Sequence, residues 1–180
     1  MQKTHEHFMQ EAIKEARQSL DAGDFPVGCV LVSEGKIISR GRRIHTLQPD
    51  NTPPSCMPNE LDHAEIIALR ELRDSHPDTD PAGVVVYSTM EPCLMCYATL
   101  LLNNIHTIVY AYEDAMGGGT TLPLSRLTPL YRQMNPTIIP GILRDESLSL
   151  FKQFFTTPGL DYWKGSLLAE YTLAQSQGPT

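Results

Sequence analysis

The sequence predicts an α/β fold in which helices cover both faces of a mixed five-stranded sheet. An early hairpin of two β-rich segments supplies antiparallel pairing, since only antiparallel strands can be joined by a short turn. After the hairpin, apolar runs typical of buried strands alternate with segments whose apolar residues recur at helical spacing. Strand–helix–strand units place their strands parallel, so we expect strands four and five to run parallel within a three-layer α/β/α fold.

The first half of the chain begins with a helix and a hairpin. Apolar residues recur at helical spacing over 4–21, which predicts an amphipathic helix that Gly23 ends. Residues 25–33 are β-rich, a tight turn covers 34–36, and the return strand runs over 37–43. Two adjacent strands of the sheet are therefore expected early in the chain.

The second half alternates helices with strands. Asp62 is the expected N-cap of a helix over 64–73, and the wholly apolar run 84–88 predicts a buried strand. Pro92 is expected at the first position of the next helix, which runs to about residue 102. The remaining expected elements are a strand over 107–112, a short helix near 122–132, a strand over 137–142, and helices over 144–156 and 160–175.

No linker or internal repeat divides the chain, so residues 1–180 are expected to form a single domain. Residues 44–61 contain four prolines and are long for a plain connection, which is typical of a functional loop bordering a pocket. Residues 157–180 are expected to form a C-terminal helical extension that frays at its end.

Composition and charge narrow the class of protein. A hydrophobic content of 41% and a charged content of 19% are typical of a globular chain. The net charge of −7 disfavours nucleic acid as a partner, because phosphate contacts need clustered Lys and Arg. No apolar stretch approaches the roughly 20 residues that span a bilayer, and the N-terminus lacks the apolar core of a signal peptide. We therefore expect a cytoplasmic protein with no membrane partner and with reduced cysteines.

Two short motifs carry the chemistry, and both lie at expected helix starts. The first is His63-Ala64-Glu65, and the second is Pro92-Cys93-Leu94-Met95-Cys96. Cys93 follows His63 by 30 residues, which leaves room for one strand and lets the two helix starts meet. Helix N-termini carry partial positive charge and free N–H groups, so they favour Cys93 and Cys96 as thiolate ligands of a metal.

One imidazole and two thiolates make three protein ligands, which is the pattern of a catalytic zinc site with an open fourth position. Zinc lowers the pKa of a bound water toward about 7 and can supply hydroxide near neutral pH. Glu65 falls on an inward helical stripe with Leu69 and Leu72, where a carboxylate needs a partner or a task. The task that suits it is proton transfer from water to a ring nitrogen and a departing amine.

These motifs resemble those of the zinc nucleobase deaminases, the cytidine and deoxycytidylate deaminase-like superfamily, which pair His-x-Glu with Pro-Cys-x-x-Cys. From about Phe8 to Phe155 the chain looks similar to bacterial tRNA adenosine deaminases and to guanine and cytosine deaminases. The matching segments are 25–28, 63–65, 91–96, 141–143, 145–146 and 154–155. The resemblance implies a cytidine deaminase-like fold, Zn²⁺ on His63, Cys93 and Cys96, Glu65 as proton shuttle, and a homodimer.

Substrate contacts are expected from Phe25, Arg43, Ala64, Glu91 and Trp163. Members of the superfamily usually carry Asn where Arg43 stands, and Arg offers only donors, so an anionic substrate group becomes possible. After Gly159 the tail is aromatic and slightly acidic rather than basic, which resembles the C-terminal cover of small-base deaminases.

Three residues keep two interpretations. Cys56 is either an inert loop thiol or a fourth ligand that would close the metal site and make it structural. Tyr162 and Trp163 either anchor the last helix in the core or cover the pocket. A Cys-x-x-Cys motif also occurs in thioredoxin-like redox pairs, but His63 and Glu65 would have no role in such a site.

The sequence therefore predicts a zinc-dependent hydrolase that releases ammonia from a free nucleobase, a nucleoside or a related heterocycle. Deamination of adenosine in tRNA is one alternative, which the segment 141–143 favours and the acidic tail opposes. A non-catalytic zinc-binding module with a deaminase fold is the other, and the presence of Glu65 argues against it.

Overall fold

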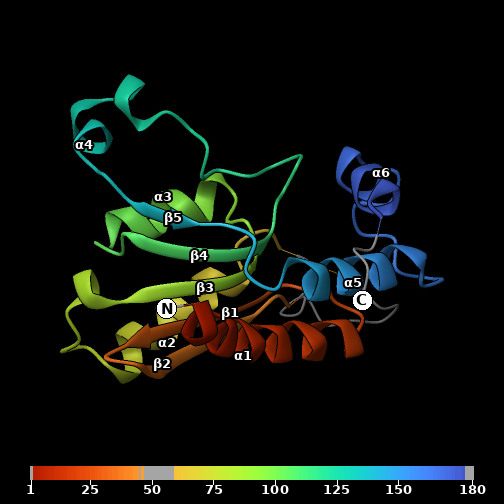
Figure 1. The fold of residues 1–180 in the computed structure, drawn as a ribbon, viewed down its shortest axis with the longest axis horizontal. Coiled ribbons are helices and arrows are strands. Elements are labelled where there is room, and N and C mark those ends of the chain that lie inside the picture. The colour runs from red at the N-terminus through yellow and green to blue at the C-terminus, as the bar shows by residue number, and fades with distance from the viewer. Residues whose placement is uncertain (1, 45, 47–58, 177–180) are drawn as a thin grey trace.

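The centre of the computed structural model is a five-stranded sheet with the strand order β2-β1-β3-β4-β5 (Figure 1). The strands are β1 (Gly28–Ser33), β2 (Lys36–Arg42), β3 (Val85–Met90), β4 (Thr107–Tyr112) and β5 (Thr137–Ile139). β1 is antiparallel to both β2 and β3, while β3, β4 and β5 run parallel. The predicted mixed sheet and its parallel fourth and fifth strands are confirmed. The structure describes residues 2–44, 46 and 59–176.

Six helices are present in these residues, together with two short 3-10 turns at Pro81–Gly83 and Leu124–Arg126. The helices are α1 (Gln2–Asp21), α2 (Ala64–Ser75), α3 (Leu94–Leu102), α4 (Pro129–Arg132), α5 (Arg144–Thr156) and α6 (Leu167–Ala174). None of the described helices is long and apolar enough to cross a lipid bilayer.

Two glycines show how the helices reach opposite faces of the sheet. A Cβ on Gly28 would lie 2.2 Å from the Ala12 carbonyl oxygen of α1, and one on Gly41 would lie 2.1 Å from the Ala64 carbonyl oxygen of α2. Gly41 pairs with Cys29, the neighbour of Gly28, and successive strand residues point to opposite faces. Thus α1 and α2 lie on opposite faces. Since α5 packs beside α1 and α3 beside α2, the predicted three layers are confirmed.

The start of α2 at Ala64 is confirmed, but its predicted N-cap was wrong by one residue and the predicted start of α3 was wrong by two. His63, not Asp62, is the N-cap of α2, and the Asp62 carboxylate instead accepts a hydrogen bond from the Asn59 amide. Cys93 is the N-cap of α3, so Pro92 precedes the helix instead of opening it. The reason is tertiary, because Cys93 has extended backbone and forms an isolated β-bridge with Gly118.

The C-terminal half also departs from the pattern-based prediction. β5 ends at Ile139, before Pro140, which has no N–H for a ladder hydrogen bond. The helix expected near 122–132 is split into the 3-10 turn and α4, which begins with Pro129. The last helix starts at Leu167 instead of residue 160, because Trp163 and the glycine at 165 have left-handed backbone. Helices α1 and α5 and strand β4 agree with prediction.

Most of the predicted loop over 44–61 lies outside the described residues, because 45 and 47–58 are not among them. The two interpretations of Cys56 therefore fall outside this structure. The C-terminal end was expected to fray over residues 176–180, of which only residue 176 is among the described residues.

Candidate active site

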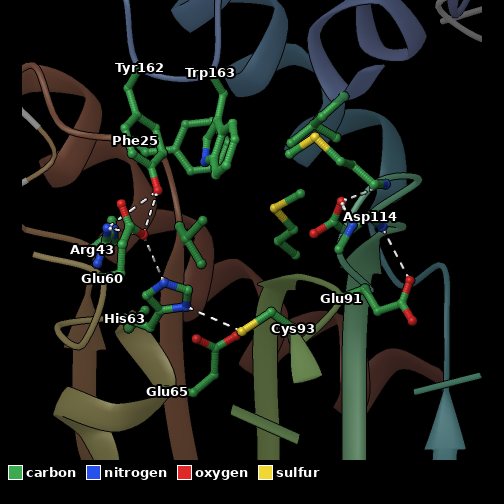
Figure 2. Close-up of a pocket in the computed structure, with 16 residues that line it drawn as sticks. Phe25, Arg43, Glu60, His63, Glu65, Glu91, Cys93, Asp114, Tyr162 and Trp163 are labelled. Atoms are coloured by element: carbon green, nitrogen blue, oxygen red, sulfur yellow. Dashed lines mark hydrogen bonds and ion pairs between the residues drawn. The ribbon is translucent and has the colours of Figure 1, made fainter. Parts of the chain in front are cut away.

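The candidate metal ligands come from two helix starts that face each other. His63 stands just before α2, Cys93 stands just before α3, and Cys96 lies in the first turn of α3. His63 and Cys93 have extended backbone, as N-cap residues do, but neither side chain caps its own helix. Both side chains instead turn toward each other (Figure 2).

The geometry of these three side chains fits a zinc ion. The His63 Nδ1 atom lies 3.5 Å from Cys93 Sγ and 3.4 Å from Cys96 Sγ. All three ligand atoms lie within 4.8 Å of one another. A tetrahedral zinc ion bound at usual Zn–S and Zn–N lengths sets the sulfur–nitrogen separation at about 3.5 Å. The donor set and its spacing therefore suit zinc without rearrangement.

The pKa values of the two thiols are shifted in opposite directions. Hydrogen bonds from Cys96 and then from His63 lower the pKa of the Cys93 thiol to about 4, even though its burial acts in the opposite direction. The hydrogen bond to Cys93 and burial raise the pKa of Cys96. The hydrogen bonds from Cys96 and His63 favour the thiolate form of Cys93, which is the form that binds a metal.

Glu65 lies next to this cluster and is only 3% exposed. Its Oε1 atom accepts a hydrogen bond of 2.9 Å from the hydroxyl of Ser88 in β3. Burial raises the pKa of the Glu65 carboxyl. The predicted inward stripe is present, since Leu69 and Leu72 are also buried. A fixed, desolvated carboxyl beside the metal ligands has the placement that a proton-transfer group needs.

A cavity of about 300 Å³ opens above His63 and Glu65. The five residues predicted to contact substrate all line it: Phe25, Arg43, Ala64, Glu91 and Trp163. Tyr162 and Trp163, here called the aromatic cover, enter the cavity from the side opposite His63 and Glu65 (Figure 2). The Tyr162 ring packs on Phe25 with centroids 5.3 Å apart. The aromatic cover therefore borders the cavity, and Tyr162 is also anchored on the apolar core.

Arg43 borders the cavity but is not a free cation. It is 2% exposed, and its Nη2 atom donates to Glu60 at 3.1 Å and to the Tyr162 hydroxyl at 3.4 Å. The anionic substrate group that the sequence left open would share this guanidinium with Glu60, whose contact is to Nη2, while the buried Nη1 atom has no hydrogen-bond partner among the described residues.

Glu91 also has its carboxylate engaged by the protein. It accepts hydrogen bonds from the Asp114 N–H and from both the N–H and the hydroxyl of Thr120. A Cβ on Gly118 would lie 2.5 Å from this carboxylate, so a side chain at position 118 would displace the Glu91 carboxylate from its contacts. Glu91 thereby holds the loop after β4 against the cavity.

Several cavity residues were not predicted individually as substrate contacts, although Glu60 lies in the predicted pocket-bordering loop and Tyr162 was offered as part of a cover: Val27, Glu60, Met90, Asp114, Met116, Gly117, Tyr162 and Leu168. A signal existed for Asp114, because it follows the end of β4, and ligands gather at the carboxyl ends of parallel strands. Glu60 lies at the end of the loop over 44–61 that was expected to border the pocket, although nothing in the sequence singled it out as a contact.

Comparison with known proteins assigns the family. Residues 2–112 match the family model of the cytidine and deoxycytidylate deaminase zinc-binding region. The chain belongs to this family. As a cytidine deaminase-type protein it is a zinc-dependent hydrolytic deaminase, as the motifs predicted.

Individual relatives of this deaminase are similar over most of the chain. A tRNA-specific adenosine deaminase from Agrobacterium fabrum is 31% identical over 156 residues, which cover 86% of this chain and 96% of the relative. A solved structure from a study of A-to-I editing by tRNA:A34 deaminases is 28% identical, with a TM-score of 0.65 over 80% of this chain and 98% of that one. Guanine deaminase from Nitrosomonas europaea, 18% identical over 82% of each chain, shares the fold with a TM-score of 0.61.

In this deaminase His63, Cys93 and Cys96 would hold the zinc ion, which when bound supplies the Lewis acid that activates water. The predicted zinc cofactor and the cytidine deaminase-like fold are both confirmed.

Proposed function

We propose that this deaminase acts on a single amino-substituted base, taken up as a free nucleobase or a nucleoside. The observation that carries the proposal is the aromatic cover, which lies over the cavity opposite His63 and Glu65. A cavity of about 300 Å³ with one aromatic wall suits one flat ring. Trp163 is 45% exposed, so its indole face is available to a ring entering the cavity.

In the proposed reaction, Glu65 takes a first proton from the attacking water and delivers it to the ring nitrogen. It then takes the remaining hydroxyl proton and delivers it to the departing amine, which leaves as ammonia. Ser88 fixes the direction of the carboxyl through Oε1. Phe25, Ala64 and Trp163 provide the apolar contacts to the ring. The sum of the reaction is replacement of the amino group by a carbonyl, with release of ammonia.

Adenosine in tRNA is the second candidate substrate. Sequence similarity favours it more strongly than a free base, since the relative that is 31% identical is a tRNA-specific adenosine deaminase. The expectation that the net charge of −7 disfavours tRNA is not supported by this similarity. The tail from 157 to 176, which packs α6 beside α5 and lines the cavity through Leu168, would then have to leave an anticodon loop access to Glu65.

A substrate panel separates these candidates. Purified protein loaded with zinc is incubated with guanine, adenine, cytosine, their nucleosides, and a tRNA that carries adenosine at the wobble position. We expect ammonia release from a base or nucleoside with kcat/KM at least about tenfold above that for tRNA. Turnover of tRNA alone, with binding that weakens steeply with salt, would establish the second candidate instead. No turnover of any member would favour a non-catalytic zinc module.

We also propose that the chain acts as one deaminase domain and forms a homodimer. The stretch from β4 to β5, here called the arm (residues 120–136), projects away from the sheet (Figure 1). Its leucines at 122 and 130 are 36% and 59% exposed, and Leu94 and Leu102 of α3 are 56% and 53% exposed. Apolar surface of this extent supports contact with a second copy.

A further inference from the structure

Glu60 lies three residues before His63. Three side chains approach one oxygen of its carboxylate, two of them within hydrogen-bond distance. The Oε2 atom accepts hydrogen bonds from Tyr162 Oη at 2.9 Å and from Arg43 Nη2 at 3.1 Å. The same oxygen lies 3.6 Å from Nε2 of His63 (Figure 2). The side chain is 63% exposed and borders the cavity, so these contacts, and not burial, hold it in place.

The two nitrogens of His63 therefore face different partners. Nδ1 is directed at the sulfurs of Cys93 and Cys96, and Nε2 is directed at Glu60. An imidazole that binds a metal through one nitrogen usually donates its other N–H to a carboxylate, which fixes the tautomer and the ring orientation. Glu60 is the carboxylate that faces this second nitrogen, at 3.6 Å, which is slightly longer than a hydrogen bond.

We propose that Glu60 is a positioning residue that holds the proton of His63 on Nε2 and so presents Nδ1 to the zinc ion. The inference rests on the proposed assignment of His63 as a metal ligand. It adds a residue that neither motif contains, because Glu60 precedes the His-x-Glu string.

The same carboxylate ties the aromatic cover to the metal site. Tyr162 lies in the segment between α5 and α6, about a hundred residues away in sequence, yet its hydroxyl donates to the oxygen that faces His63. The Arg43 guanidinium stacks 5.7 Å from the Tyr162 ring centroid and binds Glu60 as well. Seating of the cover over the cavity therefore fixes the orientation of Glu60, and through it that of His63.

A simpler role for Glu60 is to neutralise Arg43, whose side chain is only 3% exposed. That role explains the Arg43 contact but predicts no change at the metal when Glu60 is removed. Zinc affinity therefore distinguishes a positioning residue from a counter-ion.

The test compares Glu60→Ala, Glu60→Gln and Tyr162→Phe with the wild-type protein, using Glu170→Gln on the exposed side of α6 as control. Zinc affinity is measured by competition with a chromogenic chelator, and the ligand geometry by the visible spectrum of the cobalt-substituted protein. We expect Glu60→Ala to weaken zinc binding by about 10–100-fold and to shift the cobalt bands. Glu60→Gln should weaken it less, because an amide oxygen still accepts from Nε2–H.

The link to the cover has its own expected result. Tyr162→Phe should weaken zinc binding by a smaller factor, and it should have no further effect in the Glu60→Ala background. Unchanged zinc affinity and an unchanged cobalt spectrum in both Glu60 variants would overturn the proposal and leave Glu60 as a counter-ion of Arg43. If Glu60→Ala fails to fold, Glu60→Gln decides. A wild-type protein that binds no zinc would instead overturn the metal assignment on which the inference rests.

Discussion

Glu65 combines the features that a proton-transfer group needs, namely burial, a fixed direction and a place beside the metal ligands. Its pKa is raised by burial, and Ser88 orients the carboxyl through Oε1. Gln has the same shape and can keep the Ser88 contact, but it cannot carry the proton. The Glu65→Gln change therefore isolates proton transfer from packing.

We predict that Glu65→Gln lowers kcat for deamination by about 10²–10⁴-fold, the range that a general acid–base residue contributes. The zinc content of the same samples should stay at the wild-type level, because Glu65 is not among the three ligands. Steady-state ammonia release and metal analysis check both parts, with Glu170→Gln as a surface control. A variant with wild-type kcat would remove Glu65 from the chemistry.

The role expected for Arg43 from the sequence changes once its partners in the folded protein are known. In the sequence it stands where the superfamily usually has Asn, which pointed to an anionic substrate. In the folded protein Arg43 forms an ion pair with Glu60, and its guanidinium stacks on the ring of Tyr162. Its contacts hold Glu60 and Tyr162, two residues that line the cavity, in place.

At the scale of elements, α2 can reach the sheet only because residue 41 lacks a side chain. A Cβ there would lie 2.1 Å from the Ala64 carbonyl oxygen and 2.6 Å from the Ala68 nitrogen. Both atoms are backbone and cannot swing aside, so α2 would have to shift. Since His63 and Glu65 lie at the start of α2, the shift would move the site.

Gly41→Ala is accordingly expected to destabilise the protein by about 1–3 kcal/mol and to weaken zinc binding. Gly83→Ala is the matched control, because a Cβ there meets nothing within 4 Å and its backbone is not left-handed. Denaturant unfolding and chelator competition measure the two effects. Equal stability of the two variants would contradict the close packing of α2 on β2.

The C-terminal helices are joined to the sheet by an ion pair. Arg144, the first residue of α5, donates to Glu113 at 2.8 Å, and the Tyr171 hydroxyl of α6 donates to the same carboxylate at 2.8 Å. Burial acts to raise the pKa of Glu113, but the hydrogen bonds from Arg144 and Tyr171 outweigh it and hold this pKa below its usual value. A carboxylate with a depressed pKa stabilises the fold above its unfolded pKa of about 4.3 and loses that contribution as the pH falls through the folded pKa.

From this sign we expect Glu113→Gln to lower Tm by about 2–4 °C at pH 7. As the pH falls below the unfolded pKa of about 4.3 and through the lower folded pKa, the wild-type carboxylate becomes protonated too, so the difference should shrink toward zero. Thermal unfolding of both proteins from pH 3 to 8 checks this, again beside Glu170→Gln. A difference in Tm that is the same at every pH would mean that the charge of Glu113 is not what holds the C-terminal helices.

For the whole molecule, the exposed leucines of α3 and the arm make a testable case for self-association. We expect size-exclusion chromatography with light scattering to give about twice the 20.1 kDa mass of one chain. Leu122→Glu combined with Leu130→Glu should give the monomer, because charges would be buried in the contact. Leu173→Glu, at an equally exposed position on α6, should leave the dimer intact. A monomeric wild-type protein would refute the proposed dimer.

Local sequence determined the secondary structure and the metal-binding motifs of this protein. Helical spacing predicted α1 and α5, and β4 was predicted at its observed bounds. His63, Glu65, Cys93 and Cys96 were recognisable because each motif lies within a few residues of a helix start, where residue type and spacing are sufficient.

The tertiary structure alone decided how the cavity is completed. Because Cys93 forms a β-bridge with Gly118, α3 starts later than the sequence predicted. The loop after β4 donates a hydrogen bond to the carboxylate of Glu91. Glu60 meets Tyr162 across 102 residues of sequence. No local periodicity encodes such contacts, because they depend on how separate elements pack. For that physical reason the sequence predicted zinc chemistry and offered Tyr162 and Trp163 as a pocket cover, while the contacts that join Tyr162, Glu60 and His63 were visible only in the folded chain.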